Sequence, residues 1–170
     1  MNATTRVLLV SALSVAVLAG CSKKVKEQPV AEGPAPATPT APVADDGRYG
    51  PEDLDTDACL RQRVIYFDFD QDALKPEFQA IVSCHAKYLV DRPSARVTLQ
   101  GHADERGSRA YNQALGERRG NAVNSALQAA GGSASQLEVV SFGEERPVCT
   151  ESNEACWAQN RRVEIIYNAR

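Results

Sequence analysis

One arginine lies where a positive charge is costly. The spacing of apolar residues predicts a helix over residues 109–130, and at about 100° per residue Arg119 falls within its apolar stripe. The other members of the stripe are Tyr111, Leu115, Ala122, Val123, Ala126 and Ala130. A guanidinium that points toward a core needs an anion and hydrogen bonds to replace its hydration. Arg119 therefore requires a negative partner, either an internal carboxylate such as Asp104 or Asp70, or the anionic group of a ligand.

Asp104 lies just before this helix, in the segment Gly101–Gly107 (GHADERG) that follows a predicted strand. Loops at sheet edges commonly carry binding groups. An aspartate and an arginine displayed together complement a zwitterion, because the carboxylate accepts from an ammonium group and the guanidinium donates bidentately to a carboxylate. Asn112 lies at the edge of the apolar stripe. The pattern indicates a site for a ligand that carries both an ammonium group and a carboxylate.

Strands that alternate with helices must position these residues. Strands are predicted over residues 64–69, 95–100, 137–142 and 162–167, and helices over residues 76–89, 109–130 and 155–159. Ile65, Phe67 and Phe69 share one face of the first strand, and His85 lies on the apolar stripe of the first helix as a core histidine. This order, βαβαβ(α)β, predicts an α+β fold: a two-layer sandwich with helices packed on a four-stranded mixed sheet.

The first 20 residues are predicted to be a lipoprotein signal peptide. Arg6 precedes an apolar run over residues 7–18, which is shorter than the roughly 20 residues that span a bilayer. The small residues before Cys21 resemble the lipobox of bacterial lipoproteins, whose cysteine receives diacylglyceryl and N-acyl chains. The alternative is an ordinary secretory signal that Cys21 follows by chance. Ser22 in place of aspartate implies export to the outer membrane, with the domain facing the periplasm.

Residues 21–50 have the composition of a tether. They are rich in Pro, Ala and Thr and poor in large apolar residues, so they cannot bury enough surface to fold, and we expect them to be disordered. Residues 51–170 remain as one domain with a single core.

Four further cysteines would meet oxidising conditions in an exported chain. Cys149 and Cys156 flank a short polar stretch and could close a loop, and Cys59 and Cys84 would then pair by elimination. Four cysteines allow three connectivities, so the pairing stays open.

Several other kinds of site are disfavoured. The net charge is only −3, so no nucleic-acid partner is indicated. The chain has 2 histidines, which excludes a histidine-rich metal site. Asp68, Asp70 and Asp72 resemble the start of a calcium loop, but the sixth and twelfth positions do not fit. Asp104 and Glu105 are adjacent, whereas glycosidase carboxylates lie about 5–9.5 Å apart across the scissile bond. We therefore expect a binding protein and not an enzyme.

Six sequence segments carry a resemblance to a known family. They are Val64–Asp70 (VIYFDFD), Gly101–Gly107, Tyr111–Asn112, Leu115–Arg119 (LGERR), Val140–Glu144 (VSFGE) and Asn160–Val163 (NRRV). In order and spacing, over about residues 62–168, they resemble the peptidoglycan-associated lipoproteins, a family of OmpA-like peptidoglycan-binding domains. The predicted lipobox and tether agree with this resemblance.

The resemblance implies a pocket for meso-diaminopimelate on the stem peptide of peptidoglycan. Asp104 would take the side-chain ammonium group and Arg119 the neighbouring carboxylate, which the backbone amides of Phe69 and Asp70 would assist. Asn112 and Leu115 would line the pocket. Peptidoglycan of the lysine type lacks this carboxylate and would leave Arg119 unpaired.

The resemblance also implies a partner and a cellular role. The family binds TolB through a surface that overlaps the pocket and serves the Tol-Pal complex in envelope integrity and cell division. His102, Glu105 and Arg106 are candidates for that surface. The domain would be a monomer without a cofactor, apart from the covalent lipid on Cys21. Relatives often lack the pair Cys149 and Cys156, which makes that loop a local variation.

Overall fold

The computed structural model describes residues 47–170. The predicted signal peptide, the lipidation site Cys21 and nearly all of the predicted tether lie outside the described residues. The predicted domain begins at residue 51, but ordered contacts begin earlier. The Tyr49 ring lies 6.3 Å from the Tyr88 ring, and the Tyr49 amide donates to Asp91 Oδ2 at 2.9 Å.

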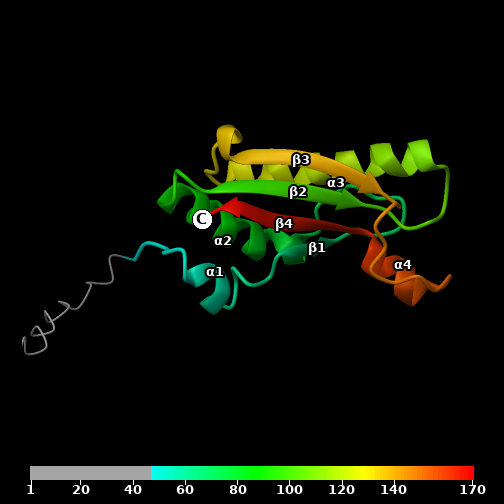
Figure 1. Cartoon of the computed structure of the whole chain (residues 1–170), viewed down its shortest axis with the longest axis horizontal. Helices are drawn as coiled ribbons and strands as arrows, with labels where there is room; N and C mark the ends of the chain where they lie inside the picture. Colours follow the sequence, from blue (N-terminus) through cyan, green and yellow to red (C-terminus); the bar gives the residue numbers. More distant parts are fainter. Residues whose placement is uncertain (1–46) are drawn as a thin grey trace, which may run out of the picture. The chain divides into compact units, whose positions relative to one another are not determined.

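A four-stranded mixed sheet forms one layer of the domain (Figure 1). Its strands are β1 (Val64–Tyr66), β2 (Arg96–His102), β3 (Leu137–Gly143) and β4 (Arg162–Ala169), in the order β1-β4-β2-β3. The pair β2 and β3 is parallel, and β4 is antiparallel to both β1 and β2. The helix that joins β2 to β3 therefore returns the chain across one face of the sheet.

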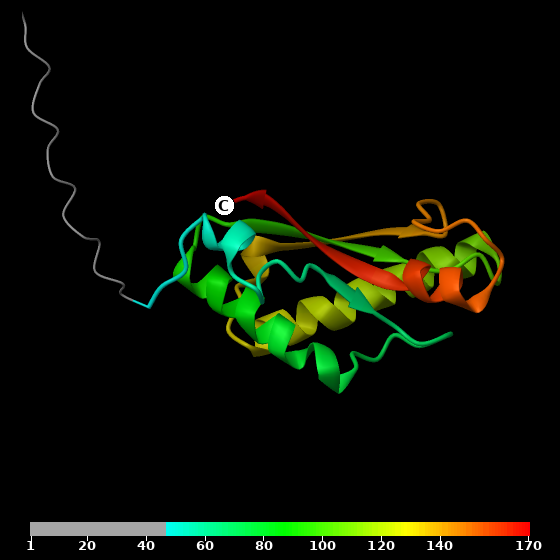
Figure 2. The same cartoon turned by 90° about the horizontal axis from the view of Figure 1, so that it is seen from below.

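Helices form the second layer, on one face of the sheet (Figure 2). The helical segments are α1 (Asp53–Thr56), η1 (Pro76–Phe78), α2 (Gln79–Asp91), α3 (Arg109–Ala129), η2 (Ala134–Gln136) and α4 (Glu154–Asn160). The core lies between α2, α3 and the sheet, and fully buried members of it include Ile65, Leu99, Val123 and Ile165. The predicted α+β sandwich is confirmed, and α1 was not predicted.

Two short-range predictions need correction. The first strand ends at Tyr66, and Phe69 is 55% exposed although Ile65 and Phe67 are buried as predicted. The reason is that pairing with β4 stops at Tyr66, so the alternation of faces does not continue to Phe69. On α3 the buried face is centred on Asn112, Gly116, Arg119, Gly120, Val123 and Leu127. Tyr111 is 44% exposed and does not belong to that face.

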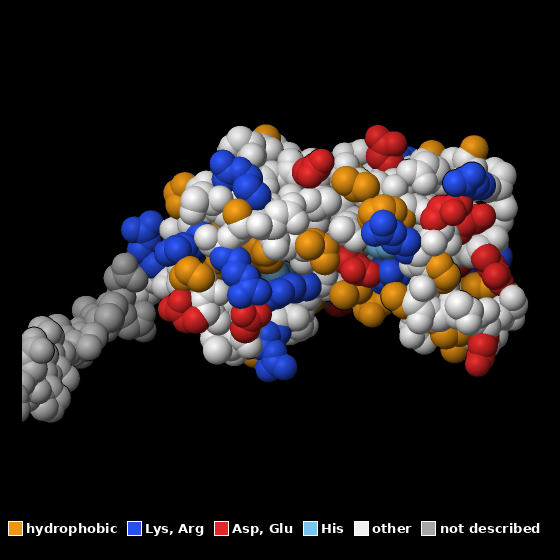
Figure 3. Space-filling view, in the orientation of Figure 1, with side chains coloured by type: hydrophobic (Ala, Val, Ile, Leu, Met, Phe, Trp, Pro, Cys, Tyr) orange, Lys and Arg blue, Asp and Glu red, His pale blue; other side chains and the backbone are white. Residues whose placement is uncertain are grey.

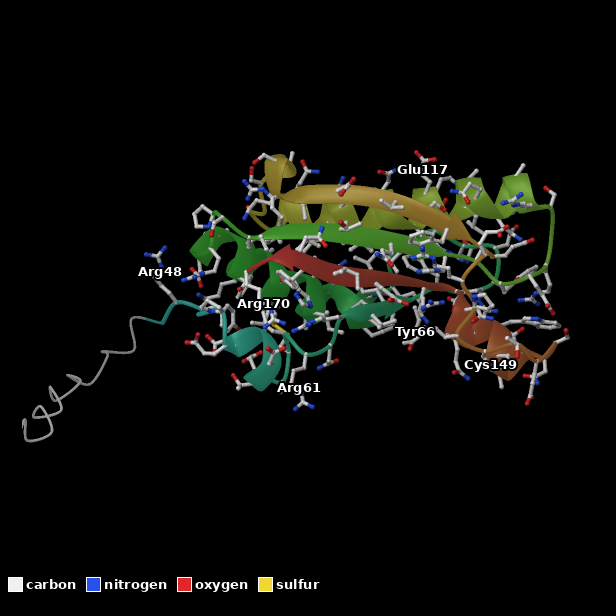
Figure 4. The ribbon with its side chains drawn as sticks, viewed as in Figure 1. Arg48, Arg61, Tyr66, Glu117, Cys149 and Arg170 are labelled. Atoms are coloured by element: carbon white, nitrogen blue, oxygen red, sulfur yellow. A yellow bond between two sulfur atoms is a disulfide. The ribbon has the colours of Figure 1, made fainter. Side chains whose placement is uncertain are left out.

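Close packing of α3 on the sheet depends on two helical glycines. A Cβ atom at Gly116 would collide with the Ser141 side chain and the Gly101 backbone, and one at Gly120 would collide with Val139. The residues on the outer side of α3 remain exposed, and Figure 4 shows Glu117 projecting away from the sheet. The glycines therefore bring the helix that carries Arg119 against the ends of β2 and β3.

The core histidine and the cysteines have partners. His85 is fully buried, and its ring nitrogens lie 2.9 Å from the Tyr167 hydroxyl and 3.0 Å from the Gln62 carbonyl oxygen. Cys59 is disulfide-bonded to Cys84 and Cys149 to Cys156, the pairing that the sequence analysis considers first. Within residues 47–170, no helix has the length and apolar character that a membrane span requires.

The disulfide Cys59–Cys84 closes a loop across 25 residues and ties the segment before β1 to α2. In the chain-entropy model, a loop of this length contributes about 3 kcal/mol to the free energy of unfolding. We therefore expect the double replacement Cys59→Ala with Cys84→Ala to lower that free energy by about 3 kcal/mol, measured by urea unfolding. An unchanged transition midpoint would contradict this expectation.

Candidate functional site

A cavity of about 200 Å³ opens at the end of the sheet, between the β1–η1 loop, the β2–α3 loop and the first turns of α3. All six residues predicted to bind the ligand line it: Phe69, Asp70, Asp104, Asn112, Leu115 and Arg119. Arg106, Gly107 and Tyr111 complete the wall. Residues from three separate parts of the chain therefore meet around one space.

Arg119 forms the floor of this cavity, and its side chain is fully buried. Its guanidinium donates to three backbone carbonyl oxygens, from Nε to Gln71 at 2.8 Å, from Nη1 to His102 at 2.8 Å and from Nη2 to Asp68 at 3.1 Å. No carboxylate oxygen of residues 47–170 lies within 4.0 Å of it. Burial, followed by the nearby charge of Arg161, lowers the pKa of Arg119 to about 10, so the group stays charged at neutral pH.

These contacts decide between the two partners that the sequence left open for Arg119. Neither Asp104 nor Asp70 neutralises it, because Asp104 pairs with Arg106 and Arg161, and Asp70 accepts from the Tyr111 hydroxyl. A guanidinium has five N–H donors, and three of them are used here. One N–H on each terminal nitrogen therefore remains for an anion at the cavity.

Asp104 is 4% exposed and is held by two arginines. Arg106 Nη2 lies 2.6 Å from Asp104 Oδ2, and Arg161 Nη1 lies 3.3 Å from the same oxygen. Burial alone raises the pKa of Asp104, but hydrogen bonds from Arg106 and Arg161 outweigh it, and the pKa lies below its ordinary value. Asp104 is therefore ionised throughout the neutral range.

The β1–η1 loop presents two free backbone amides. The N–H groups of Phe69 and Asp70 donate to no acceptor within residues 47–170. Asp70 has a φ of 57°, in the left-handed region that aspartate tolerates better than most residues, and the hydroxyl of Tyr111 donates to its carboxylate. The loop is thereby tied to α3 beside the cavity.

The start of α3 orients the third wall. The Ser108 side chain caps the helix by accepting from the Tyr111 amide at 3.2 Å. Asn112, which is buried, follows in the first turn and donates through its side-chain amide to the Glu144 carboxylate. Leu115, one turn later and also buried, supplies the apolar part of the wall.

The three residues proposed as a partner surface have different environments. Glu105 is exposed and accepts from the Trp157 indole at 3.0 Å, and the Arg106 side chain is 28% exposed. His102 is only 1% exposed, so it cannot offer a side chain to a partner, and the prediction for this residue is wrong. The reason is that its ring stacks on Phe142, with the ring centroids 5.6 Å apart.

His102 predicts an acid sensitivity of folding. Its ring nitrogens have no hydrogen-bond partner within residues 47–170, and burial, followed by the charge of Arg162, lowers its pKa from 6.5 to about 4. The unfolded chain binds a proton below pH 6.5 while the folded chain does not, so stability falls as the pH drops from 6.5 toward 4.

We expect wild type to lose about 2 kcal/mol of unfolding free energy through this group between pH 7 and pH 5. His102→Phe keeps a ring on Phe142 but cannot titrate, so its loss should be smaller by that amount in urea unfolding at the two pH values. His85, whose pKa is also lowered by burial, is common to both proteins and cancels in the comparison. Equal losses in the two proteins would contradict the assignment.

The sequence analysis missed Arg161. Its side chain is 6% exposed, donates to the Phe67 carbonyl oxygen at 3.0 Å and holds Asp104 from a position 57 residues away. A signal was available: Arg161 lies two residues before Val163, a buried residue of β4, and so shares its side of the chain. A charged residue on that side needs a buried counter-ion, as Arg119 does.

The loop between β3 and α4 builds a second cavity, of about 230 Å³, beside the first. Its walls include Glu105, Glu144, Cys149 and Trp157. Figure 4 shows Cys149 close to α4. Since Glu105 adjoins Asp104 in sequence and Glu144 accepts from Asn112, the disulfide-bonded loop is structurally connected to the first cavity.

Two further features bear on ligand class. Within the described part of the chain, no group of three or more His, Cys, Asp or Glu residues is arranged to hold a metal ion. On the face shown in Figure 3, basic and acidic side chains are interspersed.

Comparison with known proteins agrees with these observations. A model of the OmpA family matches residues 66–161. The peptidoglycan-associated lipoprotein of Pseudomonas putida is 46% identical over 155 residues, which cover 91% of this chain and 92% of the relative. The protein of the same name from Pseudomonas aeruginosa is 44% identical over the same coverage.

Solved structures support the same assignment. The crystal structure of the peptidoglycan-associated lipoprotein from Burkholderia pseudomallei has a TM-score of 0.66 at 43% identity and covers 68% of this chain and 98% of its own. The C-terminal domain of Helicobacter pylori MotB has a TM-score of 0.58 at 21% identity, a likeness of fold alone. The chain belongs to the OmpA family and, by its similarity over most of its length, to the peptidoglycan-associated lipoproteins within it.

Proposed function

We propose that this chain is an outer-membrane lipoprotein that binds peptidoglycan non-covalently and catalyses no reaction. The names of its relatives, peptidoglycan-associated lipoproteins, support the coarse statement. Lipidation of Cys21 would hold the chain in the outer membrane, because several acyl chains bind a bilayer stably whereas a single chain binds only marginally. The domain would then connect the outer membrane to the cell wall.

The ligand that fits the cavity is the meso-diaminopimelate side chain of a stem peptide. It ends in an ammonium group and a carboxylate on one carbon atom. Asp104 would accept the ammonium group, and Arg119 would donate to the carboxylate with its remaining N–H groups. The free amides of Phe69 and Asp70 would donate to the same carboxylate, while Asn112 and Leu115 would bound the pocket.

One observation carries this proposal. Arg119 is a fully buried cation that borders a cavity, and no carboxylate within residues 47–170 pairs with it. A buried charge without an ionic partner is costly, and three carbonyl dipoles compensate it only in part. An anion that enters the cavity would recover that energy, and a zwitterion would satisfy Asp104 at the same time.

A weak single contact would be sufficient for this function. Charge-assisted hydrogen bonds contribute about 1.5–3 kcal/mol each, less the cost of ordering the ligand. Peptidoglycan offers many identical stem peptides, and the lipid anchor keeps the domain near them. Retention would therefore rise through the high effective concentration of sites.

The Tol-Pal role and the partner TolB are proposals that rest on the family resemblance. Glu105 and Arg106 are the candidates that remain for the TolB surface, since both reach the surface next to the cavity. Because this surface adjoins the cavity, TolB and peptidoglycan would compete for the domain.

The test is co-sedimentation of the full chain, carrying Cys21→Ser to prevent lipidation, with purified sacculi. We expect binding to sacculi of the diaminopimelate type, much weaker binding to sacculi of the lysine type, and no release of soluble fragments. Added TolB should release the bound chain. Equal binding to the two wall types would refute diaminopimelate recognition, and release of muropeptides would point to a hydrolase.

A further inference from the structure

The carboxylate of Asp104 has no acceptor site left for a ligand in this structure. Its Oδ1 accepts from the backbone amide and from Nε of Arg106, both at 3.1 Å. Its Oδ2 accepts from Arg106 Nη2 at 2.6 Å and from Arg161 Nη1 at 3.3 Å. An ionised carboxylate offers about four lone-pair sites. An incoming ammonium group can therefore be accepted only after one of these donors has left.

The donor that can leave is the side chain of Arg106. Arg161 is 6% exposed and is fixed by the Phe67 carbonyl oxygen at 3.0 Å as well as by Glu154 at 2.7 Å. The Arg106 side chain is 28% exposed and borders the cavity. It also has a second anion within reach, because its Nη1 lies 3.4 Å from Glu154 Oε2.

Two aromatic rings hold the Arg106 guanidinium in this position. Its central carbon lies 4.0 Å from the centroid of Phe69 and 4.1 Å from that of Trp157. A planar guanidinium stacks on aromatic faces and can slide in its own plane without losing that contact. Trp157 and Glu154 both belong to α4, so this helix supplies one stacking surface and the alternative anion.

We propose that Arg106 is an internal competitor for the ligand: it occupies the ammonium position of the empty site, and binding transfers its guanidinium from Asp104 to Glu154. This inference rests on the proposed function, because it takes the ligand to carry an ammonium group. The number of ion pairs is conserved, since Asp104 exchanges Arg106 for the ligand while Arg106 keeps Glu154. In the empty site, Arg106 prevents the nearly buried carboxylate from losing a charged partner.

The first test removes the competitor. Arg106→Met replaces the guanidinium by an unbranched apolar side chain that fits between the two rings. In calorimetry with the full chain carrying Cys21→Ser, we expect a muramyl tripeptide that contains meso-diaminopimelate to bind about fivefold more tightly to this variant. The same tripeptide with its side-chain amine acetylated carries no ammonium group and should show no gain.

Arg109→Met is the matched control for net charge. Arg109 is close to Arg106 in sequence, but its side chain is 78% exposed and pairs with Glu145 outside the cavity. This variant should leave the affinity for both tripeptides unchanged. A gain at Arg106 that Arg109 does not reproduce would be local to the cavity, whereas a purely structural role of Arg106 would weaken the binding of both tripeptides.

A second measurement follows the displacement in the wild-type chain and so does not depend on folding of the variant. Trp157 is the only tryptophan of the chain, so its fluorescence reports on the ring that stacks with Arg106. We expect the diaminopimelate tripeptide, but not its acetylated form, to change that fluorescence and to shift the Nε–H signal of Arg106 in an NMR spectrum. The Nε–H signal of Arg161 should move much less.

The outcomes separate this inference from the proposed function. If the wild-type chain binds the tripeptide but Arg106→Met binds it with equal or lower affinity, Arg106 is not a competitor and the function stands. An Arg106 signal that stays in place at saturation would lead to the same conclusion. If the wild-type chain binds neither tripeptide, the proposed function itself is wrong.

Discussion

Replacement of Arg119 by lysine is expected to weaken binding of the diaminopimelate tripeptide by about 100-fold. Lysine keeps the positive charge, but it is a point donor and cannot present the two N–H groups of a guanidinium fork to a carboxylate. Two charge-assisted hydrogen bonds of about 1.5–3 kcal/mol each are at stake. The affinity is measured by calorimetry and the retention by co-sedimentation with sacculi.

Arg118→Lys provides the control for this experiment. Arg118 is the neighbouring residue and pairs with Asp72 at 2.9 Å, but its side chain is 46% exposed and lies outside the cavity. It should bind the tripeptide with wild-type affinity. If Arg119→Lys also retained that affinity, the carboxylate of the ligand would be recognised elsewhere.

Lysine is a better replacement than alanine because Arg119 has a structural role too. Its three acceptors, the carbonyl oxygens of Asp68, Gln71 and His102, belong to two different loops. Removing the guanidinium leaves them without a donor, and each buried unsatisfied acceptor costs about 1–3 kcal/mol. We therefore expect Arg119→Ala to lower the unfolding free energy by about 3 kcal/mol or more, so its loss of binding would be hard to interpret.

Asp104→Asn is expected to abolish selection of the ammonium group. The variant should bind the diaminopimelate tripeptide and its acetylated form with similarly low affinity, whereas wild type should prefer the free amine by about tenfold or more. The physical reason is that a neutral amide has no charge to offer an ammonium group. Calorimetry with the two tripeptides measures the ratio directly, so the result does not depend on the fraction of folded protein.

The pH dependence of wild type gives a second measurement for Asp104. Hydrogen bonds from Arg106 and Arg161 keep its pKa below the ordinary value of 3.8 although burial opposes them. A lowered carboxylate pKa means that the contribution of Asp104 is present above the unfolded pKa and is lost as the pH falls through the folded pKa. Binding should therefore be constant in this respect from pH 8 to about pH 5.

Asp72→Asn removes the same charge from the surface and is the control for Asp104→Asn. The Asp72 side chain is 45% exposed and pairs with Arg118 outside the cavity. It should leave the preference for the free amine intact. If Asp104→Asn kept that preference as well, the ammonium group would have to bind another acid, and the assignment of Asp104 would be wrong.

The sequence by itself determined the order of the strands and helices and the need of Arg119 for an anion. Both follow from local periodicity: alternation marks the strands, and a spacing of three or four residues marks the buried face of α3. A cation on that face is recognisable without any knowledge of its neighbours. The family motifs then located all six residues that line the cavity.

Only the tertiary structure decided how the charges pair. Asp104 meets Arg161 from a position 57 residues away, and the nearest parts of the chain to Arg119 turned out to be carbonyl oxygens rather than carboxylates. Phe69 faces outward because pairing with β4 ends at Tyr66, and His102 is covered by Phe142 from the neighbouring strand. Such contacts depend on how separate segments pack in space, and periodicity within one segment carries no information about them.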